Sequence, residues 1–275
     1  MGYVDIHGHY AWNIDDGIQS LQEAKKALNK ARKQGISTIV ATPHVTCGKT
    51  TKAEIEMLRL RIAELQELAN KYHIEVIAGC EFMLNDEVYQ AMDQVLFIPI
   101  EDTHYLLCEY DVRKPSEAFT ENFDAYIREV TLHGYTPIIA HIERYFHDGI
   151  DLEYVQYLKS LGCLMQVNTT SLLGLSSKVH QENAHILLNH QLIHFIATDT
   201  HRVKPPRSPN MQKCFYFLYK QGYTKKYLNL MMRENPRRIL RDRQALDLEN
   251  IKGLTHFRFV LKILHQFVPV KKSYK

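Results

Sequence analysis

Two short motifs near opposite ends of the chain each hold a pair of side chains that could bind a metal ion. His7 and His9 lie in the run DIHGH, and Asp199 and His201 lie in the run ATDTH. Alternate residues of a β-strand point to the same face, so both members of each pair can reach one ion. An imidazole beside a carboxylate suits Mn, Zn or Fe. The alternative for the first motif is two solvent-facing histidines.

Further candidate ligands follow apolar runs that lie between these two motifs. Six of the seven apolar, β-rich runs end in His, Asp or Glu, whereas residues placed for solubility would more often be Lys, Ser or Asn. The additional candidates are Asp16 in the triplet Asp15-Asp16-Gly17, His44, Glu81, Glu109 and His141. Each is weak evidence by itself, but the joint pattern predicts a metal cluster, and hence a metal-dependent hydrolase.

Basic residues lie close to these candidates in the sequence. Arg144 comes just after the fifth apolar run, and the stretch 202–210 carries Arg202, Lys204 and Arg207. An arginine beside several metal ions is suited to bind phosphate through two hydrogen bonds. For Arg144 the alternative is an ion pair with the nearby carboxylates. A positive loop over the metals would attract an anionic substrate.

The elements that would position these residues alternate between strands and helices. The predicted strands are the runs YVDIHGH, ISTIVATPH, IEVIAGCEF, HYLLCEY, YTPIIAHIE, CLMQVN and IHFIATD. Segments with helical spacing lie between them, near residues 20–34, 53–72, 86–95, 116–133, 151–161, 178–190 and 209–220. Parallel strands need helical crossovers, so this order predicts an α/β fold with a mostly parallel sheet. Because the polar candidates follow the strands, we expect a distorted β/α barrel with its site at the carboxyl ends.

The bulk composition limits the classes of protein to which the chain could belong. A length of 275 residues suits one large domain, and 45% hydrophobic with 24% charged residues is typical of a globular protein. A net charge of +3 is too small to indicate nucleic-acid binding. We expect no signal peptide in MGYVDIHGHY and no membrane span, because no run of about 18 apolar residues occurs. A cytoplasmic protein is therefore expected.

The ordered motifs DIHGH, DDG, ATPH, GCE, CEY, AHIERY, QVNTTSLLG and ATDTH make the chain similar to a known family. They resemble the polymerase-and-histidinol-phosphatase (PHP) superfamily. More closely, they resemble its manganese-dependent protein-tyrosine phosphatases, which bacteria encode with capsule and exopolysaccharide genes. The resemblance covers roughly residues 3–242 and implies a PHP-type distorted (β/α)7 barrel. DIHGH is shared with many amidohydrolases, whereas AHIERY and QVN are specific to this branch.

The resemblance also implies three divalent ions, with manganese expected and iron, zinc or magnesium as alternatives. By motif, His7, His9, Glu81 and Asp199 would bind the first, a bridging Glu81 with Glu109 and His141 the second, and Asp16, His44 and His201 the third. The second aspartate of DDG is the one that matches, so Asp16 is preferred to Asp15. His201 could also donate a proton to the leaving group.

Two arginines would bind the phosphate in this branch of the family. Arg144 matches one of them, and Arg207 is the nearest match to the other. The sequence departs from the family pattern here, because the spacing is one residue longer and contains Pro205 and Pro206, and because Arg202 replaces an Asn that usually follows the histidine. Arg202 therefore stays an alternative to Arg207.

A tyrosine phosphatase with a cysteine nucleophile is excluded by spacing. That chemistry needs an arginine six positions after the cysteine, so that both surround the phosphate. The five cysteines are Cys47, Cys80, Cys108, Cys163 and Cys214, and the residues six positions later are Ala53, Asp86, Lys114, Thr169 and Lys220. Single cysteines in apolar runs indicate buried thiols and no secreted disulfide scaffold.

The resemblance thus predicts hydrolysis of phosphotyrosine on a bacterial tyrosine kinase, and through it regulation of capsule or exopolysaccharide synthesis. One alternative is a PHP-type phosphatase for a small phosphoester such as histidinol phosphate. Another is a non-catalytic regulator that binds the kinase and keeps its metals as relics. An intact set of nine candidate ligands weighs against the relic.

The chain is expected to divide into a PHP phosphatase domain, residues 1–250, and an extension, residues 251–275. The extension has six Lys or Arg and no Asp or Glu, with apolar residues between them. It could form a basic amphipathic helix that contacts anionic lipid peripherally. The alternative, which we favour, is a terminal helix packed on the barrel.

Overall fold

Parallel strands form the centre of the computed structural model, which describes residues 2–251, 254–255 and 257. In these residues one sheet has the order β1-β2-β4 and a second the order β3-β5-β6-β7-β8-β9, and all pairings are parallel. The strands are β1 (Tyr3–Gly8), β2 (Ile36–Ala41), β3 (His44–Thr46), β4 (Glu75–Ala78), β5 (Glu81–Met83), β6 (Tyr105–Glu109), β7 (Thr136–Ile139), β8 (Leu164–Asn168) and β9 (Phe195–Ala197).

Two of the seven predicted strands are interrupted. The second predicted run is divided into β2 and β3 by Thr42–Pro43, and the third into β4 and β5 by Gly79–Cys80. Pro43 has no N–H to continue a ladder of hydrogen bonds. Each break stands directly before a candidate ligand, because β3 begins at His44 and β5 begins at Glu81. The interruptions therefore separate β2 and β4 from the short strands β3 and β5, which begin with candidate ligands.

Contacts between the first and last strands close the sheet into a ring. Gly8 and Thr200 form a parallel β-bridge, and the amide of His9 donates to the carbonyl of Thr200 at 2.8 Å. The amide of Asp199 donates to the carbonyl of His7 at 2.9 Å. Since β2 leads into β3 and β4 into β5, the two sheets make one ring of seven strands. The α/β fold with a parallel sheet is confirmed, and these contacts give it the expected distorted barrel form.

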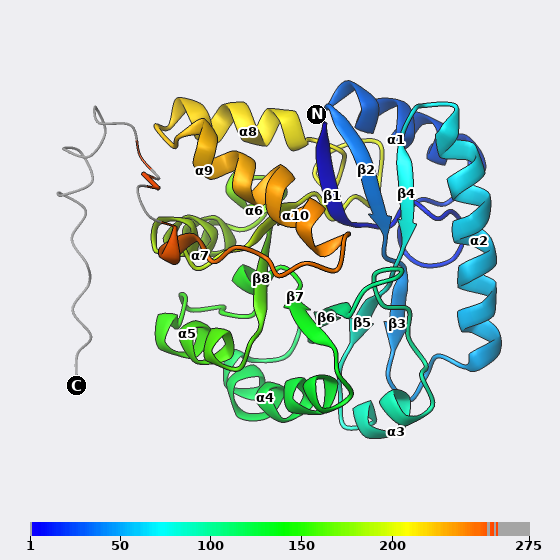
Figure 1. Cartoon of the computed structure of the whole chain (residues 1–275), viewed down its shortest axis with the longest axis horizontal. Coiled ribbons are helices and arrows are strands. Elements are labelled where there is room, and N and C mark those ends of the chain that lie inside the picture. Colours follow the sequence, from blue (N-terminus) through cyan, green and yellow to red (C-terminus); the bar gives the residue numbers. More distant parts are fainter. Residues whose placement is uncertain (1, 252–253, 256, 258–275) are drawn as a thin grey trace.

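The helices lie around the outside of the strands (Figure 1). All seven predicted helical segments are present: α1 (Leu21–Lys33), α2 (Lys52–Asn70), α3 (Val88–Asp93), α4 (Ser116–Leu132), α5 (Leu152–Ser160), α7 (Lys178–Asn189) and α8 (Met211–Lys220). Ser20 caps α1 by accepting the amide of Glu23 at 3.1 Å, and Gly35 follows the helix at φ +73°. Both ends of α1 are therefore where the sequence predicts them.

Several short elements have no counterpart in the sequence prediction. They are α6 (Thr169–Leu172), α9 (Lys225–Asn229), a π-helical turn (Leu230–Glu234), α10 (Asn235–Ile239) and two 3₁₀ turns (Ile142–Arg144 and Leu248–Asn250). Segments of three to five residues are too short to display a helical period. α9, the π-helical turn and α10 follow one another over residues 225–239, but the π-helical turn interrupts the α-helical spacing and Pro236 lies within the run. No helix in the described ranges has both the length and the apolar composition that a bilayer span requires.

Only the first part of the extension 251–275 falls within the described residues. Phe257 forms an antiparallel bridge with Tyr223, and their rings are 4.5 Å apart. The hydroxyl of Thr224 donates to the carbonyl of Thr255 at 2.6 Å. These residues pack beside the start of α9. The predicted amphipathic helix lies otherwise outside the described residues.

A buried histidine at the amino-terminal end of the barrel makes stability depend on pH. His194 is 3% exposed, and its Nδ1 accepts the amide of Met165 at 3.0 Å. Burial, with a smaller contribution from Lys159, lowers its pKa from 6.5 to about 4, although Asp247 opposes the shift. Between pH 6.5 and about 4, His194 is therefore protonated in the unfolded chain and neutral in the folded chain. The contribution of His194 to the free energy of unfolding is complete above pH 6.5 and is lost as the pH falls toward 4.

We expect protonation of this histidine in the unfolded chain to lower the free energy of unfolding by about 2 kcal/mol when the pH falls from 7.5 to 5. Denaturant unfolding of the wild-type chain and of His194→Gln at both pH values measures it. Gln keeps an acceptor for the amide of Met165 but does not titrate, so the variant should lose less stability over this interval. Parallel pH dependences would contradict the assignment.

Candidate metal centre

All nine predicted ligands meet at the carboxyl ends of the strands. The central residue is Glu81 at the start of β5, whose side chain is fully buried. Its Oε1 lies 2.8 Å from Nε2 of His141 and 3.2 Å from Nε2 of His7. Its Oε2 lies 3.1 Å from both Nε2 of His9 and Nδ1 of His44. One carboxylate thus contacts four imidazoles.

Two other carboxylates extend the cluster on the side of His201. Oδ1 of Asp16 lies 3.2 Å from Nε2 of His44 and 3.3 Å from Nε2 of His201. Oδ1 of Asp199 lies 3.3 Å from Nδ1 of His201. Glu109 completes the set, with Oε1 at 3.4 Å from Nε2 of His141. The residues that the motifs predict are therefore in mutual contact.

The donor atoms of this cluster fit divalent cations. Several of these close pairs lack the angles of a hydrogen bond, which leaves seven buried nitrogen and oxygen atoms without a hydrogen-bond partner: Nε2 of His7, His9 and His201, Nδ1 of His44 and His141, and Oε2 of Glu81 and Glu109. Leaving a buried polar atom unpaired costs free energy, and such atoms are rare in folded proteins. Imidazole nitrogens and carboxylate oxygens are also the ligands that Zn, Mn and Fe prefer. Bound ions would supply the missing partners.

The geometry divides the ligands differently from the grouping that the resemblance implies. Four sets of residues can each offer ligand atoms that lie within 4.8 Å of one another. The sets are His9, Asp16, His44 and His201; His7, His141 and Asp199; His7, His9 and Glu81; and His44, Glu81 and Glu109. Three histidines belong to two sets each, as does Glu81. Shared ligands indicate adjoining ion positions. The assignment of each ligand to one ion stays a prediction.

Burial and opposite charges act against each other on the histidines of the cluster. Burial lowers the pKa of His7, but Glu81 and Asp199 outweigh it and raise that pKa to about 9. Burial opposes protonation of His44 as well, yet Glu81 and Asp16 raise its pKa to about 12. These imidazoles must release protons to bind ions, so metal affinity will fall as the pH is lowered.

Asp15, the neighbour of the predicted ligand Asp16, positions two ligands. Its Oδ2 lies 2.8 Å from Nδ1 of His9 and accepts the amide of His44 at 3.1 Å. Its Oδ1 accepts the amide of Gly17 at 2.8 Å. Burial opposes ionisation, but the imidazole of His9 and these hydrogen bonds bring the pKa of Asp15 to about 2. The carboxylate therefore holds Nε2 of His9 toward the cluster.

The run QVN on β8 positions ligands from the opposite side. Oε1 of Gln166 lies 3.0 Å from Nδ1 of His7 and accepts the amide of His141 at 2.9 Å. Its Nε2 donates to Oδ1 of Asn168, whose Nδ2 donates to Oδ2 of Asp199, both at 2.8 Å. This chain of hydrogen bonds orients three candidate ligands. The alternation of polar residues along the strand was the available sequence indication.

Two of the candidate ligands have strained backbone conformations. His141 has φ +32° and Asp199 has φ +50°, in the left-handed region that non-glycine residues seldom adopt. Each stands two residues after the end of a strand, His141 after β7 and Asp199 after β9. Such strain persists where the surrounding structure enforces it, and it concentrates at functional sites. Here it turns both side chains into the cluster.

Two arginines line a cavity of about 190 Å³ that opens beside Asp199. Nη2 of Arg207 donates to Oδ1 and Oδ2 of Asp199 at 2.7 and 2.8 Å, and Nη1 of Arg144 lies 3.7 Å from Oδ2. Arg144 thus lies near a carboxylate and also lines a cavity, and its binding of phosphate stays a prediction. His180, a residue outside the predicted set, is part of the same wall. The cavity is thus suited to an anion.

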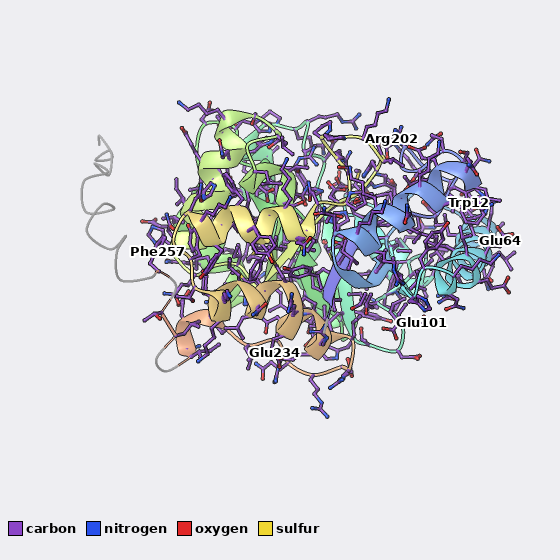
Figure 2. The ribbon with its side chains drawn as sticks, turned by 90° about the horizontal axis from the view of Figure 1, so that it is seen from above. Trp12, Glu64, Glu101, Arg202, Glu234 and Phe257 are labelled. Carbon is purple, nitrogen blue, oxygen red and sulfur yellow. The ribbon has the colours of Figure 1, made fainter. Side chains whose placement is uncertain are left out.

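Arg202 does not line the cavity that Arg144 and Arg207 share. Its Nη1 donates to the carbonyls of Asp16 and His201 at 2.7 and 2.8 Å, and also to the carbonyl of Gly17. The loop that carries it lies on the side of the molecule opposite Glu234 (Figure 2). Arg202 therefore holds the loop after β1, whereas Arg207 shares the anion cavity with Arg144.

The cysteines take no part in the cluster. All five are buried and free of disulfides, as the sequence indicates. Burial raises the pKa of the Cys47 and Cys80 thiols to about 12, and that of Cys108 well above its usual range. Thiols with such pKa values are not reactive nucleophiles at neutral pH.

Comparisons with known proteins agree with this geometry. The chain matches the family described as capsular polysaccharide synthesis, CpsB/CapC, over residues 3–241. It is 30% identical to the tyrosine-protein phosphatase YwqE of Bacillus subtilis, across 87% of this chain and 92% of YwqE. It is 27% identical to the tyrosine-protein phosphatase CpsB of Streptococcus pneumoniae, across 87% of this chain and 98% of CpsB.

Solved structures add to these similarities. A chain from the crystal structures of YwqE and CpsB, described as unique metal-dependent tyrosine phosphatases, matches with a TM-score of 0.73 and 28% identity. The match covers 88% of this chain and 96% of that one. Histidinol phosphate phosphatase from Lactococcus lactis shares the fold, with a TM-score of 0.51 and 16% identity over 74% of this chain and 88% of its own. The chain therefore belongs to the CpsB/CapC family.

Proposed function

We propose that this chain is a metal-dependent protein-tyrosine phosphatase. The observation that carries the proposal is the continuity of two features. A cluster of nine His, Asp and Glu side chains, most of them buried, adjoins a cavity lined by Arg144 and Arg207. The tyrosine phosphatases CpsB and YwqE are relatives over most of their length. A site with metal ligands and an adjacent pair of arginines suits the hydrolysis of a phosphoester.

We further propose that the cluster holds three divalent ions, with manganese as the expected metal. The ligands would be His7, His9, Asp16, His44, Glu81, Glu109, His141, Asp199 and His201. Divalent ions at such a site activate water for in-line attack and offset charge on the phosphoryl oxygens. The resemblance to the PHP superfamily and the seven unpaired donor atoms support this set.

The remaining steps fall to side chains of this chain. Arg144 and Arg207 would bind the phosphoryl oxygens, because a planar guanidinium matches their geometry and stays charged. His201 would supply a proton to the departing phenolate from its place at the edge of the cluster. A phenolate with a pKa near 10 needs little assistance to leave. The two arginines would therefore contribute more to catalysis than the proton donor His201.

Metal removal tests the proposal directly. Exhaustive chelation should reduce hydrolysis of a phosphotyrosine peptide to the background rate, and added Mn should restore it, because no cysteine nucleophile exists to replace activated water. Metal analysis of the purified protein, alongside assays with a phosphotyrosine peptide and with histidinol phosphate, makes the measurement. Full activity after chelation would contradict metal dependence.

The same assay separates the alternatives. Faster turnover of histidinol phosphate than of the peptide would favour a small-molecule PHP phosphatase, whose fold this chain shares. Binding of the peptide without phosphate release would favour a non-catalytic regulator. The phosphotyrosine substrate is the better supported, since the named relatives across most of the chain are tyrosine phosphatases.

The wider role follows from the family. We propose that the substrate is a phosphotyrosine-bearing bacterial tyrosine kinase, that dephosphorylation regulates capsule or exopolysaccharide synthesis, and that the protein acts in the cytoplasm. The phosphatase domain would comprise residues 1–250. Peripheral membrane contact through the basic residues 251–275 stays a prediction, because most of that segment lies outside the described residues.

A further inference from the structure

A groove of about 430 Å³ lies beside the metal centre, between the first half of α1 and the loop after His201. Its walls are Ser20, Gln22, Glu23, Lys26, Arg202, Val203, Lys204 and Pro205. The loop that carries Arg202 passes alongside α1 (Figure 2). The groove is distinct from the cavity that Arg144 and Arg207 line, and the proposed phosphate chemistry does not use it.

The charges along this groove are mainly positive. Lys26, Arg202 and Lys204 are exposed cations, and Glu23 is the one acid among the lining residues. Glu23 offsets one of these three charges, and its Oε2 accepts the amide of Gln19 at 3.1 Å. The lining residues keep a net charge of +2, which would attract an anionic group.

The framework of the groove is held in place by hydrogen bonds. Nζ of Lys30 on α1 donates to the carbonyl of Val203 at 2.7 Å and to the hydroxyl of Ser208 at 3.0 Å. Arg202 is fixed by the carbonyls of Asp16 and His201. A preformed wall loses little freedom on binding, so its charges are used efficiently.

One residue of the groove wall adjoins the metal centre. Arg202 follows the candidate ligand His201 directly, and its guanidinium contacts the carbonyl of Asp16, another candidate ligand. An extended peptide advances about 3.3 Å per residue, so residues flanking a phosphotyrosine at the metals would pass over the groove within a few positions. The groove is therefore placed to contact the sequence around the scissile phosphate.

We propose that this groove selects substrates in which anionic groups flank the phosphotyrosine, either acidic side chains or a second phosphotyrosine. The inference rests on the proposed phosphatase function and adds a substrate preference to it. Lys26 and Lys204 attract the anionic groups beside the phosphotyrosine, and Arg202 mainly holds the loop after His201 in place. Both flanking groups share negative charge, and the test below distinguishes them.

The test compares three peptides with one central phosphotyrosine and flanks of Gln, of Glu, or of Gln with a second phosphotyrosine. The wild-type chain should show a kcat/KM roughly tenfold higher for the anionic flanks at low ionic strength, falling as salt is added. The paired substitution Lys26→Glu and Lys204→Glu should abolish or reverse that preference through KM. Turnover of free phosphotyrosine should not change.

A matched control carries the same change of charge elsewhere. Lys220→Glu with Lys226→Glu alters two exposed lysines at the end of α8 and in α9, and the preference should survive. A preference for only the Glu or only the second phosphotyrosine flank assigns the ligand. Equal kcat/KM for all three peptides in the wild-type chain, or an equal loss in both paired variants, overturns the inference. Absence of turnover of all three peptides by the wild-type chain would instead overturn the proposed function.

Discussion

Glu81→Gln should lower kcat for phosphotyrosine hydrolysis by at least about 10³-fold, equivalent to roughly 4 kcal/mol. The two oxygens of Glu81 lie within 3.2 Å of nitrogens on four histidines. Gln has the same shape but removes the negative charge and replaces one oxygen with a donor that cannot bind a cation. Metal analysis of the variant should show fewer ions per chain, alongside the kinetic loss.

A control at the other end of the barrel distinguishes this effect from a general loss of charge. Glu101 is exposed, lies on the side opposite Arg202 (Figure 2) and accepts the amide of Ala78 at 3.3 Å. Glu101→Gln should retain both metal content and activity. If Glu81→Gln instead kept the full complement of metal and wild-type kcat, Glu81 would not be a ligand shared between ions.

Arg207→Ala should reduce kcat/KM by about 100-fold, whereas Arg202→Ala should reduce it by less than about tenfold. A hydrogen bond between charged groups contributes about 1.5–3 kcal/mol, and Arg207 faces the anion cavity together with Arg144. Arg202 contacts backbone carbonyls, so its loss loosens a loop and removes no phosphate contact. Steady-state kinetics with a phosphotyrosine peptide, and inhibition by inorganic phosphate, measure both effects.

Product inhibition adds an independent readout to this comparison. Phosphate should bind more weakly to Arg207→Ala and nearly normally to Arg202→Ala. Arg207→Lys keeps the charge but loses the planar donor pair, so it should recover only part of the lost activity. The reverse ranking of the two alanine variants would identify Arg202 as the phosphate-binding residue.

Most of the candidate metal ligands could be predicted because they lie on β-strands or just after them. Pairs such as His7 and His9 alternate along a strand that is itself visible as an apolar run, and parallel strands bring their carboxyl ends to one edge. All seven strands and the seven longer helices were found in this way, since each has enough residues to display its period. Apart from Asp16, which lies in the loop after β1 and was chosen by its match to the family motif, the choice of ligand residues thus needed no knowledge of the loops.

What the sequence did not reveal depends on contacts between distant segments. Asp15 differs from Asp16 only in which way the loop turns, and that turn is fixed by Gly17, where a Cβ would lie 2.3 Å from Cβ of His9. The role of Gln166 arises only when β8 lies beside β7 and near His7. The directions of Arg202 and Arg207 likewise follow from the path of one loop.

The bonds that join the first strand to the last have a consequence for how the protein is made. Asp5 binds the amide and hydroxyl of Thr198, a partner 193 positions later in the chain. During synthesis the ribosome must release nearly three quarters of the polypeptide before that partner exists. Until then the early histidines lack Asp199 and His201, and a nascent chain offers an ion only a partial set of ligands. Metal capture should therefore be a late event that coincides with completion of the barrel.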